Sequence, residues 1–127
     1  SFIPFRFAPM PVIHFSDPAP DPAEDRPALS RAVGTPPRRL TFERYASGDG
    51  EISMGDWECE PGAWRIAFHE GRHEFFQVMS GRLRIVDAAG NGREFGPGDA
   101  GIIPAGFIGT FEVLERVRKR YAMIDRP

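Results

Sequence analysis

The sequence predicts an all-β domain built as a sandwich or barrel of short strands. Turn signals rich in Gly and Pro recur roughly every 8 to 12 residues from residue 39 onward, which is the spacing of strands joined by turns. Phe occurs 11 times in 127 residues, and aromatic residues favour strands. No window keeps a helical period, and the length suits one domain.

The expected strands alternate between apolar and polar residues or are continuously apolar. They cover residues 40–45, 54–59, 64–68, 74–79, 82–86, 93–95, 100–103, 107–113 and 117–124. The strict alternation from Arg82 to Val86 indicates a half-buried strand. Ser80-Gly81 is expected to form a tight turn, and Gly81 and Gly98 stand where hairpins need a positive φ.

Residues 1–38 are predicted to form a Pro-rich N-terminal arm, followed by a barrel domain over residues 39–127. Prolines at this density are expected to prevent regular ladders or helices and to favour extended or polyproline conformations. The arm is too apolar for a free tail, however, since it contains Phe2, Ile3, Phe5, Phe7, Val12, Ile13 and Phe15. We expect it to lie against the barrel or a partner subunit, the alternative being a partly disordered leader. Residues 28–33 are expected to form one helical turn, and His14 is read as incidental.

Charge and cysteine content narrow the function classes. The formal net charge of −2 gives no reason to expect nucleic acid or an anionic membrane as a partner. The basic run 116–120 is interleaved with apolar residues and is read as the solvated face of a strand. Cys59 is the single cysteine, so an internal disulfide is excluded and a cytoplasmic location is expected. No apolar run is long enough to span a membrane, and no signal peptide is recognisable.

Two spaced glycine motifs resemble those of the cupin superfamily over roughly residues 40 to 125. Gly62, Glu74 and Gly81 fall in the register of the first cupin motif, and the second is matched by Gly98, Pro104 and Gly106. The resemblance implies a jelly-roll β-barrel, also described as a double-stranded β-helix. The segments 57–59, 61–64, 94–99 and 103–107 carry a finer likeness within the superfamily. There the chain looks most like the small single-domain group related to ureidoglycine aminohydrolase and to an ethanolamine-utilisation cupin. Most members of that group have no assigned substrate.

The resemblance also raises the question of a metal, because metal-dependent cupins hold an ion with three His and one Glu. Glu74 keeps the Glu position, but Phe68, Glu70 and Gly109 stand at the His positions, and a shift by one residue brings His69 onto one of them. His69, His73 and Glu74 would be the candidate ligands for Zn, Mn, Ni or Fe. The alternative is a polar loop at the barrel mouth, with Glu74 held by internal hydrogen bonds.

A site without metal is the other possibility. Glu70 and Glu74 are weak candidates for an acid and a base if both point into the barrel, and are otherwise solvated. Large residues on the expected strands fill the core, and some of them are expected to line a ligand pocket. The candidates are Trp64, Phe68, Phe76, Phe107, Phe111 and Tyr121.

Three functions remain open. The first is binding of a small polar metabolite in the barrel cavity. The second is a metal-assisted enzyme acting on a ureido, amide or amino-acid-derived substrate, and the third is a non-catalytic dimeric accessory protein. A homodimer is expected, because small cupins that resemble this chain usually pair and the apolar arm needs a surface to cover.

Overall fold

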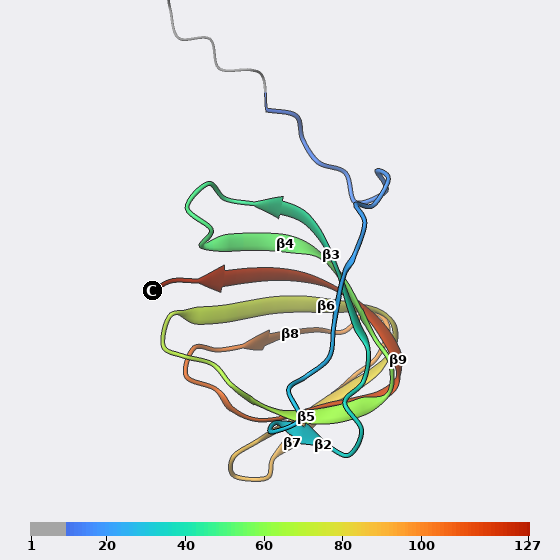
Figure 1. The fold of residues 1–127 in the computed structure, drawn as a ribbon, viewed down its shortest axis with the longest axis vertical. Helices are drawn as coiled ribbons and strands as arrows, with labels where there is room; N and C mark the ends of the chain where they lie inside the picture. Colours follow the sequence, from blue (N-terminus) through green and yellow to red (C-terminus); the bar gives the residue numbers. More distant parts are fainter. Residues whose placement is uncertain (1–9) are drawn as a thin grey trace, which may run out of the picture.

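The computed structural model describes residues 10–127 as one curled antiparallel sheet of nine strands (Figure 1). The strands are β1 (Ala23–Asp25), β2 (Ala32–Val33), β3 (Arg39–Ala46), β4 (Ile52–Cys59), β5 (Gly62–Ala67), β6 (Arg72–Asp87), β7 (Gly92–Phe95), β8 (Ala100–Ile103) and β9 (Ile108–Asp125). The all-β prediction is confirmed. Phe2, Ile3, Phe5 and Phe7 of the predicted arm lie outside the described residues. No helix within residues 10–127 has the length and apolarity that crossing a bilayer requires.

Two long strands, β6 and β9, form the spine of the sheet. They pair along almost their whole length, from Arg72 opposite Asp125 to Asp87 opposite Gly109. The other edge of β9 pairs first with β5 and then with β4, while β8 and β7 pair with successive parts of β6. The strands therefore make two halves joined by the spine, and the halves curl toward each other as a half-barrel (Figure 1).

Gly81 marks a bulge inside β6 and not the tight turn that the sequence suggested. Its φ is 78°, as the prediction required, but the chain continues as a strand on both sides while the register against β9 shifts between Val78 and Leu83. A side chain at Gly81 would collide with the backbone carbonyl of Arg116 on β9. The expected strands 74–79 and 82–86 are thus one strand, because a bulge bends a ladder without ending it.

The core lies on the concave face of the sheet and follows the alternation of the strands. Its buried residues are Cys59, Trp64, Phe76, Val78, Leu83, Ile85, Ile103, Phe111, Val113 and Val117. Burial raises the pKa of the Cys59 thiol to about 12, so the thiol stays protonated and unreactive at neutral pH.

Part of the Pro-rich segment belongs to the sheet. β1 pairs with β3 through Ala23 opposite Thr41, and β2 pairs with β5 through Ala32 opposite Trp64. Residues 28–32 form one hydrogen-bonded turn, with the carbonyl of Ala28 accepting from the amides of Arg31 and Ala32. Both strands are very short, and β1 lies between Pro22 and Pro27, which supply no N–H to a ladder.

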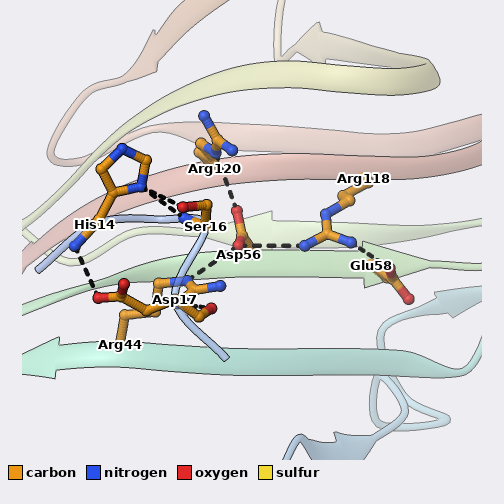
Figure 2. Close-up of polar contacts among 8 residues, drawn as sticks. All are labelled: His14, Ser16, Asp17, Arg44, Asp56, Glu58, Arg118 and Arg120. Atoms are coloured by element: carbon orange, nitrogen blue, oxygen red, sulfur yellow. Dashed lines mark hydrogen bonds and ion pairs between the residues drawn. The ribbon is translucent and has the colours of Figure 1, made fainter. Parts of the chain in front are cut away.

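A buried carboxylate organises the convex face. Asp56 of β4 is fully buried and lies among three arginines, with 3.3 Å to Arg44 Nε, 3.3 Å to an Arg118 guanidinium nitrogen and 3.4 Å to Arg120 Nε (Figure 2). Arg44 is itself only 5% exposed. We call these four residues the Asp56 cluster.

Residues 14–17 cover the Asp56 cluster as a strap. The ring of Phe15 lies between the guanidinium groups of Arg44 and Arg120, whose central carbons are 5.2 and 5.0 Å from its centroid. Arg44 also donates a hydrogen bond to the carbonyl of Asp17, and the strap is closed on itself by a bond from the His14 amide to the Asp17 side chain (Figure 2). Cation–π contact and the hydrogen bond from Arg44 to the Asp17 carbonyl together hold this segment on the sheet.

Candidate functional site

The curled sheet encloses a cavity of about 550 Å³ on its concave face. Inward-facing residues of β3, β4, β5, β6 and β9 form most of its wall, because every second residue of a strand points to the same side. The lining residues are Asp25, Arg39, Thr41, Glu43, Ala46, Gly50, Ser53, Trp57, Trp64, Ile66, Phe68, Arg72, Glu74, Ile103, Phe111, Lys119, Tyr121, Met123 and Asp125.

A buried ion pair lies in the wall of this cavity. The Nζ atom of Lys119 donates a hydrogen bond to Glu74 Oε2 at 2.6 Å, and the two side chains are 6% and 7% exposed. Glu74 comes from β6 and Lys119 from β9, and each points inward from its strand. Two opposite charges satisfy each other here, which is the condition for burying either.

Aromatic rings surround the ammonium group of Lys119. Its Nζ lies 4.5 Å from the ring centroid of Trp57, 4.8 Å from that of Phe111 and 5.1 Å from that of Phe76. Trp64 stacks on Phe111 with 5.0 Å between centroids. The rings attract the cation and exclude water, so they hold the ammonium group in place beside Glu74.

Two further ion pairs line the cavity away from the buried pair. Arg39 makes a two-pronged contact with Asp25, at 2.8 and 2.6 Å, and its guanidinium lies 5.2 Å from the ring of Trp64. Arg72 donates to Asp125 at 2.7 Å. The hydrogen bonds from Arg72 and from His69 lower the pKa of the Asp125 carboxyl.

Tyr121 brings a hydroxyl group into the cavity. A Cβ at Gly55 would meet the carbonyl of Phe42 and come within 3.0 Å of the Tyr121 hydroxyl, so the absence of a side chain at Gly55 makes room for the phenol. Burial raises the pKa of Tyr121 to about 12, and the carboxylates of Glu43 and Glu74 add to the rise. The phenol is therefore a neutral donor at physiological pH.

The structure separates the predicted pocket residues into two groups. Trp64, Phe68, Phe111 and Tyr121 line the cavity, and the wall also contains Trp57. The other two lie elsewhere: Phe76 is fully buried in the core, and Phe107 packs against the core from outside the cavity wall. Alternation assigns Phe76 to the concave face, but the neighbouring Phe95 ring covers it at 5.0 Å.

The predicted catalytic and metal residues are not brought together. Glu70 is exposed on the loop before β6, beside Gly106, and does not line the cavity that contains Glu74. His73 is exposed, and His69 Nε2 is 2.6 Å from Asp125 Oδ1. Across residues 10–127 no group of three or more His, Cys, Asp or Glu side chains is placed to hold a metal ion.

The residues present do not fit the metal site that the cupin resemblance implies. Glu74, the retained ligand, directs Oε2 at the ammonium of Lys119. Gly109, at a His position of the motif, has no room for a side chain, because a Cβ there would collide with the carbonyl of Val86 and lie 2.8 Å from the Phe107 ring. We therefore derive no step through a metal.

Lys119 is a cavity residue that the sequence analysis missed. The prediction of a solvated face over residues 116–120 holds for Arg116, Arg118 and Arg120, whose side chains are 60%, 41% and 44% exposed. Lys119 is buried because it shares the inward face with Val117 and Tyr121. A usable signal was present, since Tyr121 was a predicted pocket residue and Lys119 precedes it by two positions.

The family model of the EutQ-like cupin domain matches residues 46–121. The chain belongs to this family. The match covers the strands that carry Trp57, Glu74 and Lys119, and it confirms the resemblance to an ethanolamine-utilisation cupin. No curated protein matches the chain.

Solved structures confirm the cupin fold. A protein of unknown function from Pseudomonas syringae pv. tomato superposes with a TM-score of 0.73 at 19% identity, over 87% of this chain and 46% of that one. The Clostridium difficile EutQ protein gives 0.61 at 19% identity, over 70% and 64% of the two chains. A putative ethanolamine utilization protein Q from Salmonella typhimurium gives 0.63 at 15% identity, over 84% and 97%. At these identities the likeness concerns the fold, and this EutQ-like cupin spans about half of the Pseudomonas protein.

Proposed function

We propose that this EutQ-like cupin binds a small polar metabolite in the cavity of its half-barrel. One observation carries the proposal: a cavity of about 550 Å³ has aromatic walls and a buried ion pair, Glu74 with Lys119, facing its interior. Ligand pockets are typically apolar, of several hundred Å³, and have a few well-placed polar groups. The binding needs no metal, because the ammonium of Lys119 supplies the positive charge beside Glu74.

The open cavity favours binding over a purely structural role. An accessory protein without a ligand would be expected to fill its interior with Phe68, Phe76 and Phe111. Of these three, Phe76 is withdrawn into the core while Phe68 and Phe111 leave the space between them open.

Tryptophan fluorescence tests the proposal directly. Trp57 and Trp64 are the two tryptophans of the chain, and both line the cavity. A metabolite that enters should change their emission in a saturable manner and raise the melting temperature, since a ligand that binds the folded state stabilises it. A screen of small polar metabolites, in the presence of a chelator, should therefore yield compounds that move both signals together.

A cavity-filling variant provides the control. Thr41→Phe places a ring in the cavity and should abolish the response, whereas Thr110→Phe makes the same change on the convex side of β9 and should keep it. Compounds that bind both variants equally would place the site elsewhere. A screen without a single saturable hit would leave the proposal without support.

A further inference from the structure

The Glu74–Lys119 pair has hydrogen-bonding capacity that the protein itself does not use. An ammonium group has three donor hydrogens and a carboxylate has two acceptor oxygens. Within residues 10–127 Lys119 donates one hydrogen bond, to Glu74 Oε2, and Glu74 Oε1 accepts none. Both residues line the cavity. A donor and an acceptor therefore lie side by side in its wall.

The surroundings fix this donor–acceptor pair in place. Lys119 is held by the rings of Trp57, Phe76 and Phe111 and by its bond to Glu74. A flat group that reaches the pair would lie against the rings of Trp57 and Phe111, which meet edge to face at 5.7 Å between centroids. Aromatic walls favour a planar ligand group at this position.

The charge of the pair sets the charge of its ligand group. The ammonium and the carboxylate already cancel, and both are more than nine-tenths buried. An added carboxylate would be repelled by Glu74 and an added ammonium by Lys119, and either would bury a charge without a partner. A neutral group avoids this cost and can satisfy both open positions at once.

We propose that the Glu74–Lys119 pair recognises a planar, neutral group that has an acceptor oxygen and an N–H side by side, as a carboxamide has. The oxygen accepts from Lys119 Nζ and the N–H donates to Glu74 Oε1. This inference rests on the proposed function, because it names the ligand chemistry of the same cavity. It makes Lys119 the cationic group of the site, beside the Glu74 carboxylate.

A matched pair of probes tests the inference. Benzamide and benzoate have the same ring and nearly the same shape, but only benzamide offers a neutral donor–acceptor edge. Titration of each into the wild-type protein, followed by amide NMR shifts of cavity residues, should show benzamide binding at least about tenfold tighter, the effect of leaving a buried charged group unpaired.

The Glu74→Gln variant should shift the preference toward benzoate. The glutamine oxygen can still accept from Lys119, which keeps the hydrogen bond, but the pair now has a net positive charge and should shift the benzamide-to-benzoate ratio toward benzoate by about tenfold or more. Glu58→Gln is the same change on the convex face, where Glu58 contacts Arg116 and Arg118, and should leave the ratio unaltered.

The outcomes separate this inference from the proposed function. Wild-type protein that binds benzoate as well as benzamide, or a ratio unchanged in Glu74→Gln, would overturn the inference. So would the absence of binding by either probe. In those cases cavity binding stands if another metabolite still quenches Trp57 and Trp64, and falls with the inference if none does.

Discussion

The two faces of the same strands differ in a way that simple alternation would not suggest. The concave face should be purely apolar, yet it buries Glu74 and Lys119 at its centre. The convex face should be polar, yet it buries Asp56 completely under the strap and exposes large apolar side chains. Alternation thus decides the side of the sheet that a residue faces, while the local partners decide its burial.

Five apolar side chains of the convex face form one continuous row across the sheet. Tyr45, Met54, Ala122, Phe75 and Ile102 are successive cross-strand neighbours on β3, β4, β9, β6 and β8. The side chains of Phe75 and Ile102 are 51% and 72% exposed. We call these five residues the convex row. The convex row contains no charged side chain. Two copies of the row can therefore face each other without repulsion between like charges.

The largest effect is expected from breaking the buried pair on the concave face. Lys119→Met leaves Glu74 as an uncompensated buried carboxylate and should lower the free energy of unfolding by about 3–5 kcal/mol. Arg118→Met, one residue away on the convex face and 41% exposed, should cost less than about 1 kcal/mol. Urea denaturation of both variants measures the difference.

A double variant sharpens this test. Lys119→Met combined with Glu74→Leu removes both charges and should recover most of the loss, because replacing a whole buried pair by apolar residues is often neutral. Equal losses of unfolding free energy in Lys119→Met and Arg118→Met would contradict this difference between the buried Glu74–Lys119 pair and the exposed Arg118.

Asp56 and Glu58 lie on the same face of the sheet but differ in burial. Substitutions at the two positions test whether burial of the side chain or the face of the sheet determines the loss of stability. Asp56→Asn removes the charge that faces three arginines and should lower the free energy of unfolding by roughly 1.5–3 kcal/mol. Glu58→Gln lies on the same face, but the Glu58 side chain is 20% exposed, so the loss should stay below about 1 kcal/mol. Similar losses of unfolding free energy in Asp56→Asn and Glu58→Gln would mean that the Asp56 cluster stabilises the fold no more than a surface contact does.

Tyr121 gives a pH-dependent signature of the concave face. Its pKa is raised to about 12, above the value of about 10 for an unfolded chain. The stabilisation from this shift is complete below about pH 10 and is lost as the pH rises through 12. The phenolate absorbance of wild type minus Tyr121→Phe should appear near pH 12. A difference signal near pH 10 would show that Tyr121 is solvated.

The smallest change in stability is expected on the convex row. Phe75→Ser should alter the free energy of unfolding by about 0.5 kcal/mol or less, since the ring is half exposed. We expect the homodimer predicted from the sequence to use this charge-free row. Light scattering should then give a dimer for the full chain and a larger monomer fraction for Phe75→Ser. A wild-type monomer would contradict the predicted dimer, and an unchanged Phe75→Ser dimer would exclude the row.

Much of the site was accessible from the sequence, but not its central contact. Period-two patterns and turn spacing predicted an all-β fold, and the cupin resemblance placed Glu74 at the Glu position of the first motif, with a polar loop at the barrel mouth as the alternative. They did not identify Lys119 as the partner of Glu74, because the two residues are 45 positions apart and meet only when β6 and β9 pair. The predicted ligands Glu74 and His69 follow from the cupin motif and His73 from its closeness in sequence, but the strand turns His73 and Glu74 to opposite faces.

The sequence by itself determined the class of the fold, the family and the alternation of each strand, because these depend on local spacing and turn chemistry. The tertiary structure alone decided that Gly81 is a bulge and not a turn, that Phe76 belongs to the core while Trp57 lines the cavity, and that Lys119 is buried while Arg118 is exposed. These outcomes depend on which strands become neighbours and how far the sheet curls, and both are set by contacts between residues far apart in the chain.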